Sequence, residues 1–226
     1  MSSINMASLR GFAANRWEKL LQQFDDLDAL RQRLDYQTYI LAAAGLASSL
    51  LLGFADLATR GSIEARREED MQTMLEQVVP SSLHDNVLLR DVKTIIDDKA
   101  TTLVYVARMQ GKVTAVAFEF AASGGYSGPI LLMMGVDTDG AVLGVRVVTH
   151  AETPGLGDKI ERSKSDWILS FDGRSLGNTN TERWKVKKDG GDFDQFAGAT
   201  ITPRAVVRGV KAGLTFFLRH KAELLE

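Results

Sequence analysis

The chain has 226 residues, 45% of them hydrophobic and 25% charged, which is enough for one sizeable buried core and a small additional segment. Its formal net charge is −2 with the two signs interspersed, so no basic face is expected and nucleic acid is excluded as a partner. The absence of cysteine excludes disulfides, iron–sulfur clusters and cysteine zinc sites.

Known enzyme signatures are also missing. The histidines, His84, His150 and His220, are too far apart for a metal-ligand spacing. No Gly-x-Ser-x-Gly elbow, complete Gly-x-Gly-x-x-Gly fingerprint or phosphate-binding loop ending in Gly-Lys-Ser/Thr occurs. The sequence therefore gives no reason to expect a hydrolase, a dehydrogenase or a nucleotidase.

Residues 1–35 predict an amphipathic helix. Apolar side chains recur from Leu9 to Leu34 at intervals of mostly three and four, with charges of both signs between them. The mixed polar face is unlike that of helices that bind anionic lipid. We expect this helix to contact a partner subunit or the membrane interface, and a loosely ordered extension is the alternative.

Residues 36–57 predict a transmembrane helix. No charged residue occurs from Tyr36 to Ala55, and a helix of about 20 apolar residues spans the hydrocarbon core of a bilayer. Tyr36 and Tyr39 fit an interfacial aromatic belt. A buried core helix or a signal peptide would give a similar pattern, but the polar flanks disfavour the first and the distance from the N-terminus disfavours the second. Basic residues balance across the span, so charge does not set its orientation.

Residues 58–98 are expected to form a connector. A helix is predicted from Ser62 to Val79, because its second half carries Met71, Met74, Leu75 and Val78 at helical spacing and Pro80 ends it. The remainder of this stretch is interpreted as a linker.

Residues 99–226 predict a domain of class α+β. Alternating β-branched and aromatic residues indicate two strands joined by a hairpin turn at Gln110-Gly111, and two further strand candidates follow them. Short spacing between the strands predicts one antiparallel sheet with the later helices packed on it. The strands are expected at residues 102–109, 113–120, 129–136 and 142–149.

Two glycine-rich turns follow strands of this sheet. The first, 124–128, is a loop by its composition. The second, 152–157, contains Pro154, Gly155 and Gly157 and predicts a tight turn in which both glycines have positive φ. Such a turn can bring backbone N–H groups to the edge of a flat ring such as a flavin. It can equally be a connector into a helical segment, 158–171, where Trp167 is expected to be part of the core.

The stretch 194–203 ends in a strong helix start. Thr202 followed by Pro203 predicts a helix from Pro203 with Thr202 as its N-cap. Thr200 then lies just before a helix N-terminus, where unpaired N–H groups and the helix dipole favour a phosphate. Gly198 and Ala199 leave the approach open. On this pattern alone, a simple capping role remains an alternative, and Lys187 and Lys188 are interpreted as a solvated face.

The run 190–207 resembles the flavinylation motif of the FMN-binding domain family. In that family a Ser/Thr-Gly-Ala-Thr core ends in a threonine that is esterified to FMN through the phosphate. Thr200 matches that threonine, while Ala197 stands where the family usually has Ser or Thr. Together with 150–160 and 165–168, this run is similar to the family of G subunits of Rnf-type electron-transport complexes. The resemblance extends roughly from Met71 to Val210.

The resemblance implies a membrane-anchored electron carrier with covalent FMN. Its partners would be the other membrane subunits of a Rnf-type complex, which couples ferredoxin and NAD redox chemistry to ion movement, and a flavin transferase for maturation. It implies a bacterial inner-membrane protein with its N-terminus in the cytoplasm and its FMN domain on the periplasmic side. The implied cofactor-binding residues are Thr200 as the covalent carrier, with Gly198, Ala199, Thr202, Glu152, Thr153, Leu156, Gly157, Tyr126 and Asp194.

Two alternatives stay open. The C subunit of the sodium-translocating NADH:quinone reductase has a similar motif and is a second interpretation within the same class. A membrane-tethered sensor or interaction module, which binds flavin or nothing and relays no electrons, is the alternative from another class. Flavin retained by the denatured protein would separate a covalent flavoprotein from an empty module, and stable membrane partners would separate an electron relay from a sensor.

Overall fold

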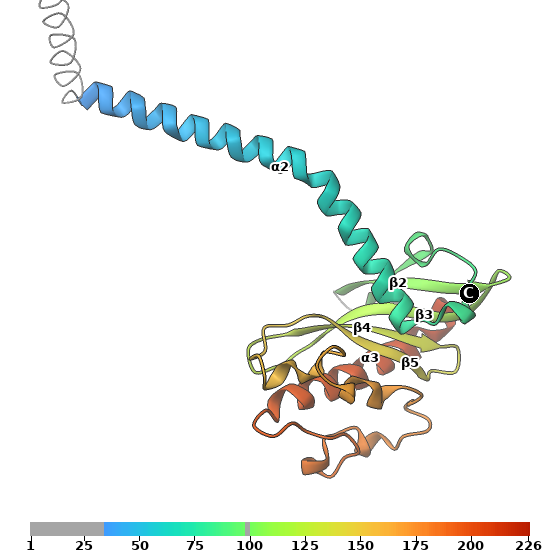
Figure 1. Cartoon of the computed structure of the whole chain (residues 1–226). Helices are drawn as coiled ribbons and strands as arrows, with labels where there is room; N and C mark the ends of the chain where they lie inside the picture. Colours follow the sequence, from blue (N-terminus) through green and yellow to red (C-terminus); the bar gives the residue numbers. More distant parts are fainter. Residues whose placement is uncertain (1–33, 98–99) are drawn as a thin grey trace, which may run out of the picture. The chain divides into compact units, whose positions relative to one another are not determined.

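The computed structural model describes residues 34–97 and 100–226 (Figure 1). Nearly all of the predicted N-terminal amphipathic helix, 1–35, lies outside the described residues. The chain divides into two compact units, Met1–Glu64 and Ala65–Glu226, which are described separately.

Within the described residues, one helix is long and apolar enough to cross a membrane. It is α2, Leu34–Val78, and its most apolar window has a mean hydropathy of 1.8 with none of it buried. Leu41 and Phe54 are 76% and 73% exposed, as expected of side chains that face lipid. The separate span and connector helix expected from the sequence are one continuous helix, because Gly61 is the only poor helix former between them and a single glycine costs about 1 kcal/mol.

The second unit is built on an antiparallel sheet, as predicted. The sheet has five strands in the order β1-β2-β3-β4-β5, and with α3, Ile201–Leu225, it confirms the α+β class. The first strand was not predicted, since it falls in the stretch interpreted as a linker. The strands are β1 Val92–Asp97, β2 Ala100–Met109, β3 Lys112–Ala122, β4 Ile130–Asp137 and β5 Val142–Thr149.

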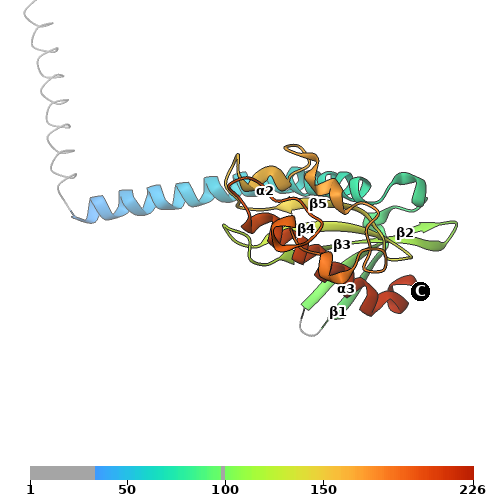
Figure 2. The ribbon, with the colours of Figure 1, turned by 90° about the horizontal axis from the view of Figure 1, so that it is seen from below.

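Each face of the sheet has its own core. Alternate residues such as Phe118 and Met134 face α3 and pack into the larger cluster, and Figure 2 shows α3 lying along the sheet. On the opposite face, Met133 packs with Val78 from the last turns of α2. A Cβ at Gly135 would lie 2.0 Å from the carbonyl oxygen of Val78, so this glycine is what lets the helix end approach the strand.

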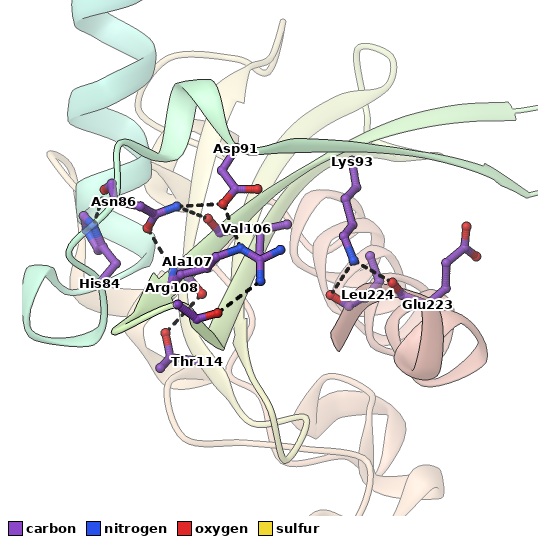
Figure 3. Close-up of polar contacts among 11 residues, drawn as sticks. His84, Asn86, Asp91, Lys93, Val106, Ala107, Arg108, Thr114, Glu223 and Leu224 are labelled. Atoms are coloured by element: carbon purple, nitrogen blue, oxygen red, sulfur yellow. Dashed lines mark hydrogen bonds and ion pairs between the residues drawn. The ribbon is translucent and has the colours of Figure 1, made fainter. Parts of the chain in front are cut away.

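Polar side chains of β1 tie it to the end of α3 (Figure 3). Lys93 Nζ donates to the carbonyl oxygens of Glu223 at 2.8 Å and Leu224 at 3.5 Å, which places a cation at the negative end of the helix dipole. Asp97 accepts two hydrogen bonds from Arg219, and these hold the pKa of Asp97 below its ordinary value.

A second polar network fixes the segment before β1 (Figure 3). Asn86 Nδ2 donates to Asp91 at 3.1 Å and to the carbonyl oxygen of Val106 at 2.9 Å, and Arg108 Nε donates to the same Asp91 carboxylate at 2.9 Å. These bonds hold residues 86–91 along β2, so the chain enters β1 next to β2 although the sequence before β1 has loop character.

Residues 157–200 carry an aromatic cluster instead of a regular helix. The predicted helical segment 158–171 is two 3₁₀ turns, Gly157–Ile160 and Asp166–Phe171. Trp167 is 9% exposed and packs against Phe171 and Phe196 at centroid distances of 5.5 and 5.2 Å, which confirms its place in the core. Its Nε1 donates to the Asp194 carbonyl oxygen at 2.8 Å. The cluster therefore anchors the loop that leads to α3.

Candidate flavin-binding site

The N-terminus of α3 differs from the prediction. The helix begins at Ile201, and Thr200 is its N-cap residue, with φ −85° and ψ −26° and no side-chain capping hydrogen bond. The Thr200 carbonyl oxygen accepts from Arg204 N at 3.4 Å. Thr202, predicted as the cap, lies inside the first turn, where Pro203 is also tolerated because first-turn N–H groups have no helical partner. The Thr200 hydroxyl is thus left unused by the cap.

Thr202 is committed to a different partner, the carboxylate of Glu152. Both residues are buried, at 1% and 4% exposed. Thr202 Oγ1 donates to Glu152 Oε2, and the backbone N–H of Ser127 donates to Glu152 Oε1 at 3.1 Å. A buried carboxylate is tolerated only when its oxygens are hydrogen-bonded. We call these two bonds the Glu152 clasp, which joins the turn after β5, the 124–128 loop and the start of α3.

The backbone N–H of Glu152 is hydrogen-bonded to His150. Glu152 N donates to His150 Nδ1 at 3.0 Å, so the ring proton lies on Nε2, which faces Glu161 Oε1 at 2.8 Å. The hydrogen bond from His150 is the main reason that the pKa of Glu161 is lowered. A chain of hydrogen bonds therefore runs from Glu161 through His150 to the clasp.

The turn 153–157 closes next to the clasp. The Thr153 carbonyl oxygen accepts from Leu156 N and Gly157 N, both at 3.1 Å. Gly155 has φ +79°, as predicted, but Gly157 is not among the glycines with positive φ. Gly157 is needed for space instead, because a Cβ there would lie 2.9 Å from Glu152 Cβ and from Thr202 Oγ1.

A second turn, formed by 196–199, faces the first. Ala199 N donates to the Phe196 carbonyl oxygen at 3.2 Å, and Gly198 takes φ +82°, a conformation that glycine adopts without strain. A Cβ at Gly198 would lie 3.5 Å from Leu156 Cδ2. Ala197, where the sequence departs from the family motif, is exposed.

These elements enclose a cavity of about 450 Å³. Every cofactor-binding residue expected from the sequence lines it except Asp194, whose carboxylate pairs with Lys187 at 2.7 Å outside the lining. Ile201 lines it and was missed, although it directly follows Thr200. The lining residues are Tyr126, Glu152, Thr153, Leu156, Gly157, Gly198, Ala199, Thr200, Ile201 and Thr202.

The cavity fits a flavin mononucleotide in size and chemistry. Its volume lies within the roughly 300–1,000 Å³ of small-molecule sites. Tyr126, Leu156 and Ile201 present apolar surface at 69%, 44% and 46% exposure, which suits a planar aromatic ring. The positive end of α3, together with the first-turn N–H groups, suits a phosphate at Thr200.

Two basic side chains close to the motif, those of Arg204 and Lys187, are already paired with acids. Arg204 donates from Nε and Nη2 to Asp189, both at 2.6 Å, and these bonds lower the pKa of Asp189. Lys187 is held by Asp194, so it offers no free charge to a phosphate. The N-terminus of α3 is a positive feature directly next to the Thr200 hydroxyl.

Comparison with known proteins agrees with this geometry. The family model for the FMN-binding domain matches residues 125–215. The chain is 54% identical over 187 residues to the G subunit of the ion-translocating oxidoreductase complex of Cereibacter sphaeroides, covering 82% of this chain and 85% of that protein. The proteins of the same name from Stutzerimonas stutzeri and Vibrio vulnificus are 47% and 44% identical, covering 86% and 82% of this chain and 85% and 90% of their own lengths. The chain belongs to the family of ion-translocating oxidoreductase complex G subunits and contains an FMN-binding domain.

Proposed function

We propose that this protein is the membrane-anchored electron carrier of a Rnf-type ferredoxin:NAD oxidoreductase complex and holds FMN by a phosphodiester to Thr200. The observation that carries the proposal is the state of Thr200 itself. Its hydroxyl makes no cap, it lines the cavity, and it stands at the positive end of α3. When bound, FMN supplies one- and two-electron redox chemistry, and the protein positions it and sets its potential.

The lining residues have distinct roles in this proposal. Leu156 and Tyr126 contact the ring, and the turn that begins at Thr153 lies along its edge. Gly198 and Ala199 keep the approach to Thr200 open. Thr202 and Glu152 act through the clasp, which fixes where the first turn of α3 lies.

Attachment requires a separate flavin transferase and FAD as the donor. The Thr200 oxygen bonds to the phosphorus on the FMN side of FAD, and the bond from that phosphorus to the oxygen of AMP breaks. AMP leaves, and the hydroxyl proton is released, so atoms and charge balance. Thr200 is the acceptor of this modification and carries out no catalysis of its own.

The FMN domain is proposed to lie on the periplasmic side of the inner membrane, with residues 36–57 as the span. Protease added to spheroplasts should then degrade the chain after Leu57 and spare the segment before Tyr36. Protection of the C-terminal domain would reverse the orientation.

Two measurements test the proposal against a sensor or interaction module. The wild-type protein should retain flavin fluorescence in a denaturing gel, and Thr200→Val, which keeps the shape and removes the oxygen, should fold and show none. The chain should also co-purify with other membrane subunits. Covalent flavin without stable partners would favour a sensor, and in-gel flavin fluorescence retained by Thr200→Val would contradict the attachment site.

A further inference from the structure

The face of the sheet opposite α3 is covered only in part. Its covered half includes Met133 of β4, which is fully buried beneath the last turns of α2, and Arg146 of β5, whose Nε donates to Gln77 at 3.1 Å. Glu119 of β3 pairs in register with Met133, and it is only half-buried. The cover extends over Ala117 of β3 and Ala107 of β2, which are fully buried, so the open half of this face is the part of β1 and β2 around Leu103.

The open half carries an apolar patch. Val92, Ile96 and Leu103 are 38%, 69% and 52% exposed. Thr94 pairs with Leu103 in the β1–β2 register, so Val92 and Ile96 lie diagonally on either side of Leu103, within reach of its side chain. We call Val92, Ile96 and Leu103 the β1–β2 patch.

β1 presents apolar side chains on both faces, because Ile95 is buried in the core on the α3 side while Val92 and Ile96 are exposed on the other. Lys93 and Asp97 turn inward to bond the end of α3, as Figure 3 shows for Lys93, while Val92 and Ile96 turn outward. β1 is also an edge strand, and exposed apolar edge strands are a hazard that proteins normally cover or charge. The exposure of Val92 and Ile96 on an edge strand is therefore explained better if a partner protein covers them than if they face solvent.

Glu119 borders the patch and lacks a counter-charge. Its side chain makes no ion pair or hydrogen bond with any residue in the described parts of the chain. Burial raises the pKa of Glu119, and Tyr105, beside the patch on β2, has its pKa raised by burial first and by the Glu119 charge second. Partial burial of an unpaired carboxylate is unfavourable, and a cation supplied from outside would relieve it.

We propose that the β1–β2 patch and Glu119 form the surface on which another subunit of the complex docks, through a segment with apolar side chains and one Lys or Arg that reaches Glu119. The inference rests on the subunit role proposed above. A second copy of this chain is one of the outcomes that the experiment below distinguishes; Lys93 and Arg146 would not supply its cation, because Lys93 is committed to α3 and Arg146 to Gln77 and the Val145 carbonyl oxygen.

The experiment uses the tagged full-length chain in membranes that contain the whole complex, with a photo-crosslinking amino acid at Leu103. Leu218 on α3 is the matched control, because it is an apolar residue of similar exposure, 48% against 52%, outside the patch. Crosslinking at position 103 is expected to capture another complex subunit at a segment that contains Lys or Arg, and position 218 is expected to capture none.

Two substitutions supply an independent readout. Leu103→Asp and Glu119→Lys are each expected to lower the amount of co-purified subunits about tenfold or more, as removal of an interface hot spot does. Leu218→Asp is expected to leave that amount unchanged. Trp fluorescence and in-gel flavin fluorescence check that each variant is folded and modified.

The outcomes separate this inference from the proposed function. If the wild-type chain co-purifies with the complex but the crosslink is absent, or reaches lipid or a second copy, the docking surface is wrong and the subunit role stands. Undiminished co-purification of Leu103→Asp and Glu119→Lys would overturn the surface in the same way. A wild-type chain that co-purifies with no other subunit would overturn the subunit role and the surface together.

Discussion

Replacement of Thr202 by valine tests the Glu152 clasp. Valine keeps the shape of the buried side chain and removes only the hydroxyl that donates to Glu152 Oε2, so no cavity is created. A hydrogen bond to a charged group contributes about 1.5–3 kcal/mol, and the carboxylate oxygen left behind is buried and without its donor. Thr202→Val should therefore lower the free energy of unfolding by about 1.5–3 kcal/mol.

Denaturant unfolding followed by tryptophan fluorescence measures this loss, since Trp167 and Trp184 are both buried in the aromatic cluster. In a thermal scan, the same loss corresponds to a fall in melting temperature of about 3–12 °C for a domain of this size. Thr202→Ser is the matched control, because it retains the hydroxyl and should keep most of the stability.

A double-mutant cycle with Glu152→Ala separates the clasp from a simple helix cap. If Thr202 bonds Glu152, the two substitutions should show a coupling energy of about 0.5–3 kcal/mol. If Thr202 acted only on the backbone of α3, the two effects would add to within about 0.5 kcal/mol. Additive effects, or a Thr202→Val protein as stable as wild type, would refute the reasoning.

Three further predictions concern the surroundings of the site. Gly157→Ala would place a Cβ 2.9 Å from Thr202 Oγ1, so it should lower the free energy of unfolding by about 1–3 kcal/mol and shift the flavin spectrum. An unshifted spectrum would mean that this turn only connects two elements. Lys93→Met should remove the cation at the end of α3 and lower the free energy of unfolding in urea by about 0.3–1 kcal/mol; an unchanged free energy of unfolding would contradict this role of Lys93. The pKa of Asp189 lies below its ordinary value of 3.8 because of the hydrogen bonds from Arg204. The stability difference between wild type and Asp189→Asn should therefore be constant above pH 3.8 and should shrink as the pH falls through the lower, folded-state pKa. A difference that grows in acid would contradict the ion pair.

Much of the fold could be predicted because it follows from local sequence patterns. Four of the strands are runs of mostly apolar residues between turn residues, and the apolar run from Tyr36 to Ala55 indicated a membrane-spanning helix. The G-subunit family and its FMN-binding domain were indicated by the motif around Thr200 and confirmed by the comparisons. Both rest on residues close together in sequence.

The errors share a physical cause, which is contact between residues far apart in sequence. β1 escaped prediction because Lys93 and Asp97 share its inward face with the buried Ile95 and bond partners on α3 more than 100 residues later, so the strand shows no clean alternation of apolar and polar residues. Thr202 has the local pattern of a cap, but its partner Glu152 lies 50 residues earlier. Gly157 is likewise required because a side chain there would clash with Glu152, and not because of its own φ.

The central claim is that Thr200 carries FMN, and mass spectrometry of the peptide that contains it is the most direct test. Protein purified from native membranes should yield a peptide whose mass is increased by that of FMN less one water, with fragment ions that place the addition on Thr200. An unmodified Thr200 in a preparation that retains flavin after denaturation, or an addition placed on Thr202, would contradict the account.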